Sequence, residues 1–184
     1  MFFRGAHSIY GGNMKNNTTS TRKIALAGML VALAVAGSLI SFPVAGSKCA
    51  PVQHFINIMG AVILGPFWSL GIAFCASLLR NIFGLGSPLA FPGSMVGAFL
   101  AGIAYKKIKN IYVACGGELV GTSILGGLCA YPVALLIMHS KNAALFTYII
   151  PFFISCVVGT LIAAILLTAL KKAGILAKIQ QTFS

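Results

Sequence analysis

The sequence predicts an all-α integral membrane protein, built as a bundle of six transmembrane helices. Hydrophobic residues make up 59% of its 184 residues, charged residues make up only 8%, and the mean hydropathy is +0.99. A soluble domain is typically about a quarter charged, so this chain lacks the polar residues needed to cover a surface in water. Its basic residues lie mainly in short segments between long apolar runs. A lipid bilayer accepts such an apolar exterior, provided that helices satisfy the backbone hydrogen bonds.

Each apolar run is assigned to helices by its length and by the turn residues that end it. The first run is followed by Pro43 and is close to the ~20 residues that a helix needs to cross a bilayer. The second run is too long for one crossing, and Gly65-Pro66 divides it into two antiparallel helices, of which the first is short for a full span. Gly84–Pro88 form a turn, and Pro92-Gly93 mark the start of the next helix. The predicted spans are 24–42, 52–65, 67–84, 91–105, 112–138 and 144–170, with short loops at 43–51 and 139–142.

These spans define a membrane domain over residues 23–172, flanked by two tails. Residues 1–22 form a polar, glycine-containing tail without the apolar core of a signal peptide, and residues 173–184 form a cytoplasmic tail. Met14 opens a segment that is a plausible protein start, so we expect the native chain to begin there. An ordinary disordered tail is the alternative.

The distribution of basic residues predicts the orientation. Lysine and arginine are enriched on the cytoplasmic side of membrane proteins. With six spans, ten basic residues fall on one side, and only Lys48 and Lys141 fall on the other, with Arg80 near that end of its helix. Both termini are therefore expected to be cytoplasmic. The ten residues are Arg4, Lys15, Arg22, Lys23, Lys106, Lys107, Lys109, Lys171, Lys172 and Lys178.

Several functional classes are disfavoured. The basic residues form no stripe or face, which argues against nucleic-acid binding despite the net charge of +12. The chain lacks a phosphate-binding loop of the G-x-x-x-x-G-K-[ST] type, and its single acidic residue, Glu118, cannot supply paired carboxylates. The five cysteines form no C-x-x-C pair, so neither a metal site nor a disulfide framework is expected. We expect no enzymatic activity, no ATP hydrolysis and no cofactor.

The first span carries small residues at four-residue spacing: Gly28, Ala32 and Ala36. This spacing places them on one helix face, where another helix can approach closely. From periodicity alone, packing within the chain and contact with a partner protein are about equally favoured.

A polar cluster is expected where the second and third helices end far from their connecting turn. Gln53, His54 and Asn57 lie about one helical turn apart, and Arg80 and Asn81 lie at the corresponding end of the next helix. A charged side chain within a membrane costs several kcal/mol and generally faces the bundle interior. We therefore favour a polar substrate pocket over the alternative, in which Arg80 extends to the interface and His54 serves as a cap.

Two residues of the long fifth span are further candidates for the binding site. Glu118 is the sole carboxylate, and an acid inside a membrane is a candidate for ligand contact or ion coupling, with a structural partnership as the alternative. Its position in the span suggests the cytoplasmic half, which leaves contact with the polar cluster open. Tyr131 could stack on a flat ring or could anchor the helix at the interface.

Five sequence segments together resemble the ThiW family. The resemblance covers about residues 22–172, nearly the whole predicted membrane domain, and the segments occur in the family's order. They are Lys23–Ala34, Lys48–His54, Leu79–Asn81, Ala90–Met95 and Gly117–Thr122.

The resemblance implies the substrate-specific (S) subunit of an energy-coupling factor (ECF) importer in a prokaryotic cytoplasmic membrane. Such subunits have a six-helix fold and join a transmembrane coupling subunit and two ATPases, and this family is assigned to the thiamine precursor hydroxyethylthiazole, a small thiazole alcohol. In these complexes, small residues of the first helix contact the coupling subunit; the family's A-x-x-x-A motif corresponds to Ala32 and Ala36, and this favours the partner-surface interpretation. Three alternatives stay open: a proton-coupled carrier using Glu118, an S subunit for another vitamin or thiamine itself, and a membrane enzyme, which the single carboxylate disfavours.

Overall fold

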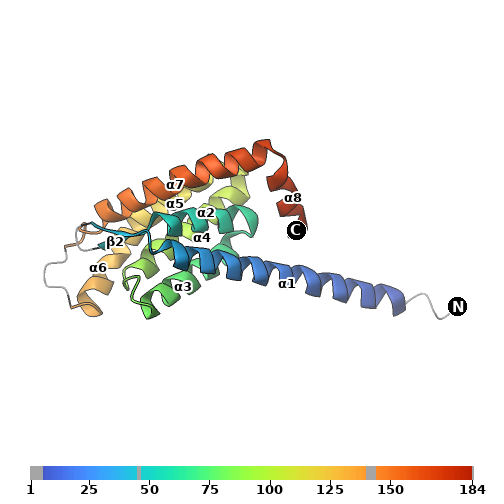
Figure 1. Ribbon diagram of the computed structural model, residues 1–184, viewed down its shortest axis with the longest axis horizontal. Helices are drawn as coiled ribbons and strands as arrows, with labels where there is room; N and C mark the ends of the chain where they lie inside the picture. Colours follow the sequence, from blue (N-terminus) through green and yellow to red (C-terminus); the bar gives the residue numbers. More distant parts are fainter. Residues whose placement is uncertain (1–5, 45–46, 140–143, 184) are drawn as a thin grey trace.

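The computed structural model describes residues 6–44, 47–139 and 144–183 (Figure 1). Arg4 and Lys141 of the charge count, residues 1–5 of the predicted tail and residues 140–142 of the predicted loop lie outside these ranges. Within them, the chain is almost entirely helical. The elements are α1 (Ala6–Gly37), β1 (Phe42–Val44), β2 (Ser47–Cys49), α2 (Pro51–Ile63), α3 (Pro66–Ile82), α4 (Ala90–Ile108), α5 (Ile111–Val120), the π-helix η1 (Gly121–Gly126), α6 (Gly127–Leu136), α7 (Ile149–Lys172) and α8 (Ile175–Thr182).

The predicted all-α membrane class is confirmed, and a helix lies at each of the six predicted positions. The fifth position is occupied by α5, η1 and α6, which follow one another without a break. In the described part of the chain, three helical segments are long and apolar enough to cross a bilayer: Thr19–Gly37, Ile111–Leu136 and Ile149–Lys172. α2 has 13 residues and is therefore about 20 Å long, shorter than the ~30 Å hydrocarbon layer. Six full crossings remain a prediction.

The first predicted span differs from the structure at both ends. α1 begins at Ala6, within the predicted tail, and ends at Gly37 rather than Phe42. Gly37 lies so close to Val52 of α2 that a β-carbon there would overlap the valine side chain. The chain turns at this crossing and forms an antiparallel hairpin, β1–β2, in which Phe42 pairs with Cys49. The sequence analysis expected only a loop here.

The last span also begins later than predicted. α7 starts at Ile149 rather than at residue 144. Before it, the backbone N–H of Ala144 donates to Thr147 Oγ1 at 3.0 Å, and the N–H of Thr147 donates to the carbonyl of Ala144 at 3.1 Å. Such local bonds hold the chain in a turn and compete with helix formation.

α4 is the central helix of the bundle. It packs against α2, α3, α5 and η1, while α7 covers α2 and the α5–η1 segment. α2 and α3 are joined by a tight turn at Gly65, whose φ of +94° is a conformation that glycine adopts without strain, and Pro66 then opens α3. This turn makes α2 and α3 antiparallel, so the start of α2 lies beside the end of α3.

The hydrophobic surface and the polar interior fit a membrane environment. Large apolar side chains are exposed along the helices, among them Phe67, Phe153, Leu161 and Ile165. So many large exposed apolar side chains suit a lipid environment. Polar side chains instead gather inside the bundle, as described below.

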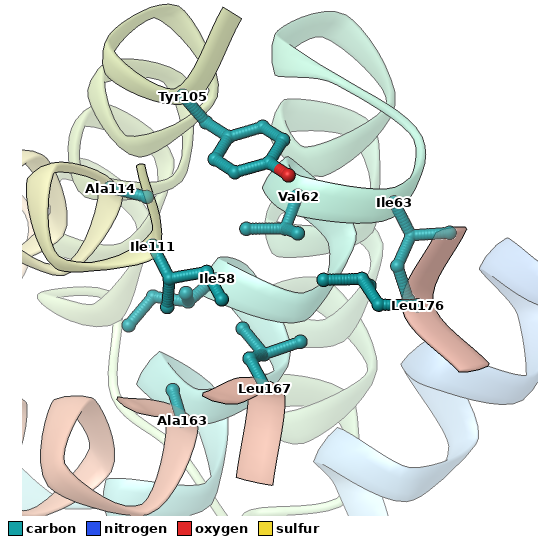
Figure 2. Packing of buried hydrophobic residues seen from close by; sticks show 9 residues of the cluster. All are labelled: Ile58, Val62, Ile63, Tyr105, Ile111, Ala114, Ala163, Leu167 and Leu176. Carbon is teal, nitrogen blue, oxygen red and sulfur yellow. The ribbon is translucent and has the colours of Figure 1, made fainter. Parts of the chain in front are cut away.

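An apolar cluster closes one end of the bundle (Figure 2). Val62 of α2, Tyr105 of α4, Leu167 of α7 and Leu176 of α8 are all buried there. Gln180 of α8 donates to the carbonyl of Val62 at 2.8 Å and contacts the hydroxyl of Tyr105 at 3.0 Å. We call this the α8 end, and the opposite end, where the β1–β2 hairpin lies, the hairpin end.

Candidate functional site

A small cavity of about 30 Å³ lies at the hairpin end, between α2, α3, α4 and α7. This space holds about two water molecules. Its wall is mixed: polar groups from α2, α3, α4, η1, α7 and the hairpin lie among small and aromatic residues. The lining residues are Lys48, Cys49, Ala50, Gln53, His54, Arg80, Ala90, Gly93, Ser94, Thr122, Phe152 and Ser155.

The first turns of α2 supply three adjacent polar side chains. Pro51 begins the helix, and Gln53, His54 and Asn57 follow on its inward face, all buried. Gln53 and His54 line the cavity, whereas Asn57 is fully buried beneath it. Their predicted convergence is therefore present in the structure.

Glu118 of α5 joins this group, although its place along the helix had suggested a different depth. It is 0% exposed, and its Oε1 atom accepts a bond from Asn57 Nδ2 at 2.9 Å and one from Thr122 Oγ1 at 3.2 Å. His54 Nδ1 lies 3.0 Å from the same oxygen, with donor and acceptor roles set by the histidine tautomer. A residue two turns into α5 therefore meets the first turns of α2 in the structure.

The second carboxylate oxygen of Glu118 is buried without a hydrogen-bond partner. It lies against Gly97 of α4, where an added β-carbon would be only 2.9 Å from Oε2 and closer still to Thr122 Oγ1. Close approach of α4 to α5 and η1 at Gly97 therefore shapes the carboxylate pocket.

Arg80 of α3 is 2% exposed and forms part of the cavity wall. Its Nη1 donates to Gln53 Oε1 at 3.4 Å, while Nε is buried without a partner. Gln53 Nε2 in turn donates to Asn57 Oδ1 at 3.3 Å, and Asn57 donates to Glu118. The side-chain amides of Gln53 and Asn57 thus connect the buried guanidinium of Arg80 to the carboxylate of Glu118.

The two other predicted site residues lie elsewhere. Asn81 Nδ2 donates to the carbonyls of Ser77 at 2.7 Å and Ser87 at 3.1 Å, which ties the end of α3 to the following turn. Tyr131 is half-buried on α6 and is not among the described residues that line the cavity. The structure therefore groups Gln53, His54, Asn57, Arg80 and Glu118, and leaves Asn81 and Tyr131 outside the cavity.

The hairpin covers the cavity and is held by bonds to α7 and to the turn after α3. Lys48 Nζ donates to the carbonyl of Gly84 at 2.9 Å, and the backbone N–H of Ala50 donates to Ser155 Oγ at 2.9 Å. Cys49 Sγ donates to the carbonyl of Pro151 at 3.2 Å, and burial raises the pKa of the Cys49 thiol, which keeps the donor proton in place. These bonds position Lys48 at the mouth of the cavity.

Several site residues were absent from the sequence prediction. Ser94, Thr122 and Ser155 line the cavity, and the hydroxyl of Ser77 lies 2.9 Å from that of Ser94. Thr122 follows Glu118 by four residues, a spacing that places both on one helix face, so the sequence could have predicted their proximity. The serines carry no comparable signal, because serine is common in membrane helices as a packing residue.

One trio has the donor atoms of a metal site. His54, Glu118 and Cys156 are buried, and one ligand atom of each lies within 4.8 Å of the others. The histidine and carboxylate atoms are already in hydrogen-bond contact with each other. These three residues could hold a metal ion, a site that the sequence analysis did not expect.

The small-residue face of α1 is exposed in this structure. Gly28, Ala32 and Ala36 point away from the bundle, whereas Leu30 and Ala34 pack inward. Packing within the chain therefore does not account for the ladder among the described residues. Gly28 also borders an apolar groove of about 430 Å³ between α1 and α3.

Comparison with known proteins gave one result. The family model described as thiamine-precursor transporter protein (ThiW) matches residues 24–173. No curated protein and no solved structure matches the chain.

Proposed function

The chain belongs to the ThiW family of thiamine-precursor transporter proteins, and we propose that it is the substrate-binding S subunit of an ATP-driven ECF importer. Its proposed substrate is hydroxyethylthiazole. The observation that carries this proposal is the buried polar cavity beside Gln53, His54 and Arg80, set in a bundle whose exterior is apolar.

The cavity has the chemistry for a small aromatic alcohol. Phe152 and the small residues Ala90 and Gly93 provide apolar wall, and the amide, imidazole and guanidinium groups provide a few directed hydrogen bonds. Small-molecule sites generally combine these two features. A thiazole ring exceeds the present space of about 30 Å³, so binding is expected to open the cavity at its mouth, beside the hairpin.

The proposed partners are a transmembrane coupling subunit and two ATPase subunits. Without a phosphate-binding loop of its own, the chain would take its driving force from them. The exposed ladder of Gly28, Ala32 and Ala36 supports a contact with the coupling subunit, because small residues let a neighbouring helix approach closely. The adjoining groove of α1 and α3 extends this apolar face.

The proposed orientation places the α8 end and both termini in the cytoplasm of a prokaryotic cell. Lys106 and Lys109 line a second hollow, which lies at the α8 end beside Gln180, whereas Lys48 lies at the hairpin end. The ends of the described chain lie toward the same side of the molecule (Figure 1). This agrees with the basic bias of cytoplasmic segments.

The test separates binding from transport. The full chain in detergent is expected to bind hydroxyethylthiazole in calorimetry, and His54→Ala is expected to bind it more weakly. Reconstituted alone in vesicles, the chain is expected not to concentrate the thiazole; with the coupling subunit and ATPases, uptake should require ATP. Uphill uptake by the chain alone, driven by a proton gradient, would replace this proposal with a proton-coupled carrier.

A further inference from the structure

Arg80 is a buried cation without a carboxylate partner. An arginine side chain stays charged in proteins, and burying an unpaired charge is strongly unfavourable. Arg80 is 2% exposed and, among the described residues, its Nε atom has no hydrogen-bond partner, while its Nη1 donates over a long distance of 3.4 Å to the neutral Gln53.

The chain itself cannot supply the missing side-chain anion. Glu118 is its only acidic residue, and the Oε1 atom of Glu118 already contacts Asn57, His54 and Thr122. Glu118 is absent from the cavity lining, whereas a second basic residue, Lys48, stands at the mouth. The described wall therefore carries positive charge and no negative charge.

We infer that the transported thiazole carries an anionic group, such as a carboxylate or a phosphate monoester, and that Arg80 binds this group and selects for it. The inference rests on the proposed S-subunit function and changes one part of it: the transported thiazole would be an anionic derivative of hydroxyethylthiazole, and the neutral alcohol would be a weaker ligand. A guanidinium presents paired donors that match the oxygens of either group. The cavity beside Arg80 is only about 30 Å³, so the ring would lie toward the mouth, where binding is expected to open it.

Other wall residues suit the same ligand. Ser155 Oγ accepts from the backbone of Ala50, so the proton of its hydroxyl is what it can offer a ligand. Lys48 adds long-range attraction at the entrance. A cationic thiazolium, as in thiamine, would meet Arg80 and Lys48 with like charge and is expected to be rejected.

The test is calorimetric binding to the full chain in neutral detergent at fixed ionic strength. The probes are hydroxyethylthiazole, its phosphate monoester, a matched thiazole carboxylate, thiamine and inorganic phosphate. Both anionic thiazoles are expected to bind about 10-fold or more tightly than the alcohol, as one charged hydrogen-bond pair provides, and thiamine is expected to bind weakest.

Arg80→Gln is expected to reduce the preference for the anionic thiazoles to about threefold or less, with little change for the alcohol, because only the charged contact is lost. Arg80→Lys keeps the positive charge but lacks the paired N–H donors of the guanidinium. It should retain part of the preference for the anionic thiazoles. Lys171→Gln removes one charge at the α8 end and is expected to preserve the whole series.

The outcomes distinguish the two proposals. Tighter binding of the alcohol than of both anions, or an equal loss of all thiazoles in Arg80→Gln, would overturn the anionic substrate but leave the S-subunit function standing. If no thiazole bound while inorganic phosphate still bound through Arg80, the thiazole assignment would fail and the anion site would stand. The wild-type series alone decides the question if Arg80→Gln does not fold.

Discussion

Glu118 connects three helical segments through one carboxylate oxygen. The donors come from Asn57 of α2 and Thr122 of η1, and His54 shares the same oxygen. In a bundle without other acids, this oxygen is the point where buried donors of α2 and η1 are satisfied together. Its first expected role is therefore structural, and a role in ion coupling is the competing interpretation.

Substitutions of Glu118 separate these roles. Glu118→Ala removes the carboxylate acceptor of the Thr122 hydroxyl and of Asn57 Nδ2, which keeps only its bond to the carbonyl of Ser94 at 3.2 Å. We expect a loss of about 2–4 kcal/mol in stability, since each orphaned buried polar group costs about 1–3 kcal/mol. Glu118→Gln keeps an oxygen in place and is expected to be much milder. Thermal unfolding in detergent measures both.

Uptake by the Glu118→Gln variant then tests coupling. A glutamine carries no exchangeable acid proton, so ATP-driven uptake is expected to persist in the reconstituted complex. Intact thiazole binding combined with abolished transport would instead indicate that Glu118 loads and releases a proton.

Part of the candidate site was predictable at the residue scale. Gln53, His54 and Asn57 share a face by their spacing, and the Gly65-Pro66 turn brings Arg80 beside them, so sequence alone predicts their proximity. The bond between Glu118 and α2 was not predictable, because it depends on how α5 packs against α2 in the bundle. Counting residues along one helix does not show which residue of another helix lies beside it.

At the scale of elements, the close contact of α4 with α5 and η1 depends on glycines. Gly97 and Gly93 of α4 lie against Gly121 and Gly126, with backbone almost touching backbone. Gly121 and Gly126 are five residues apart, and the π-helix between them places both on the face toward α4. The π-helix and the hairpin were not predicted, since both arise from contacts between distant segments.

Gly97→Ala is expected to destabilise the bundle. Its β-carbon would overlap Thr122 Oγ1 and approach Glu118 Oε2, so the threonine must move and lose its bond to the carboxylate. Overpacking of this kind costs about 1–3 kcal/mol.

Gly71→Ala on α3 is the matched control, because a β-carbon there meets nothing within 4 Å. Alanine is the better helix former, so the control should unfold at the same or a slightly higher temperature in the same detergent. Equal behaviour of the two variants would contradict the tight α4–η1 contact.

At the scale of the whole molecule, the same chain has two surfaces with separate tasks. The polar cavity lies inside the hairpin end, while the small residues Ala32 and Ala36 lie on the outward face of α1. The spacing of the small residues on α1 could be read from the sequence. Their exposure could not, because it depends on which face of α1 packs against α2 and α3. Leu30 and Ala34 occupy that inward face, which leaves the ladder for a partner.

This separation predicts that assembly can be lost without loss of binding. Ala32→Leu combined with Ala36→Leu adds bulk where a partner helix would approach, and we expect thiazole affinity to remain within about twofold while the coupling subunit no longer co-purifies. The matched control is Gly116→Leu combined with Ala169→Leu, two exposed small residues on α5 and α7, which should leave assembly intact. Pull-down with a tagged coupling subunit and calorimetry on the same preparations measure both properties. Retained assembly in the α1 variant would move the partner surface to another face of the bundle, whereas lost thiazole binding would show that α1 also supports the cavity.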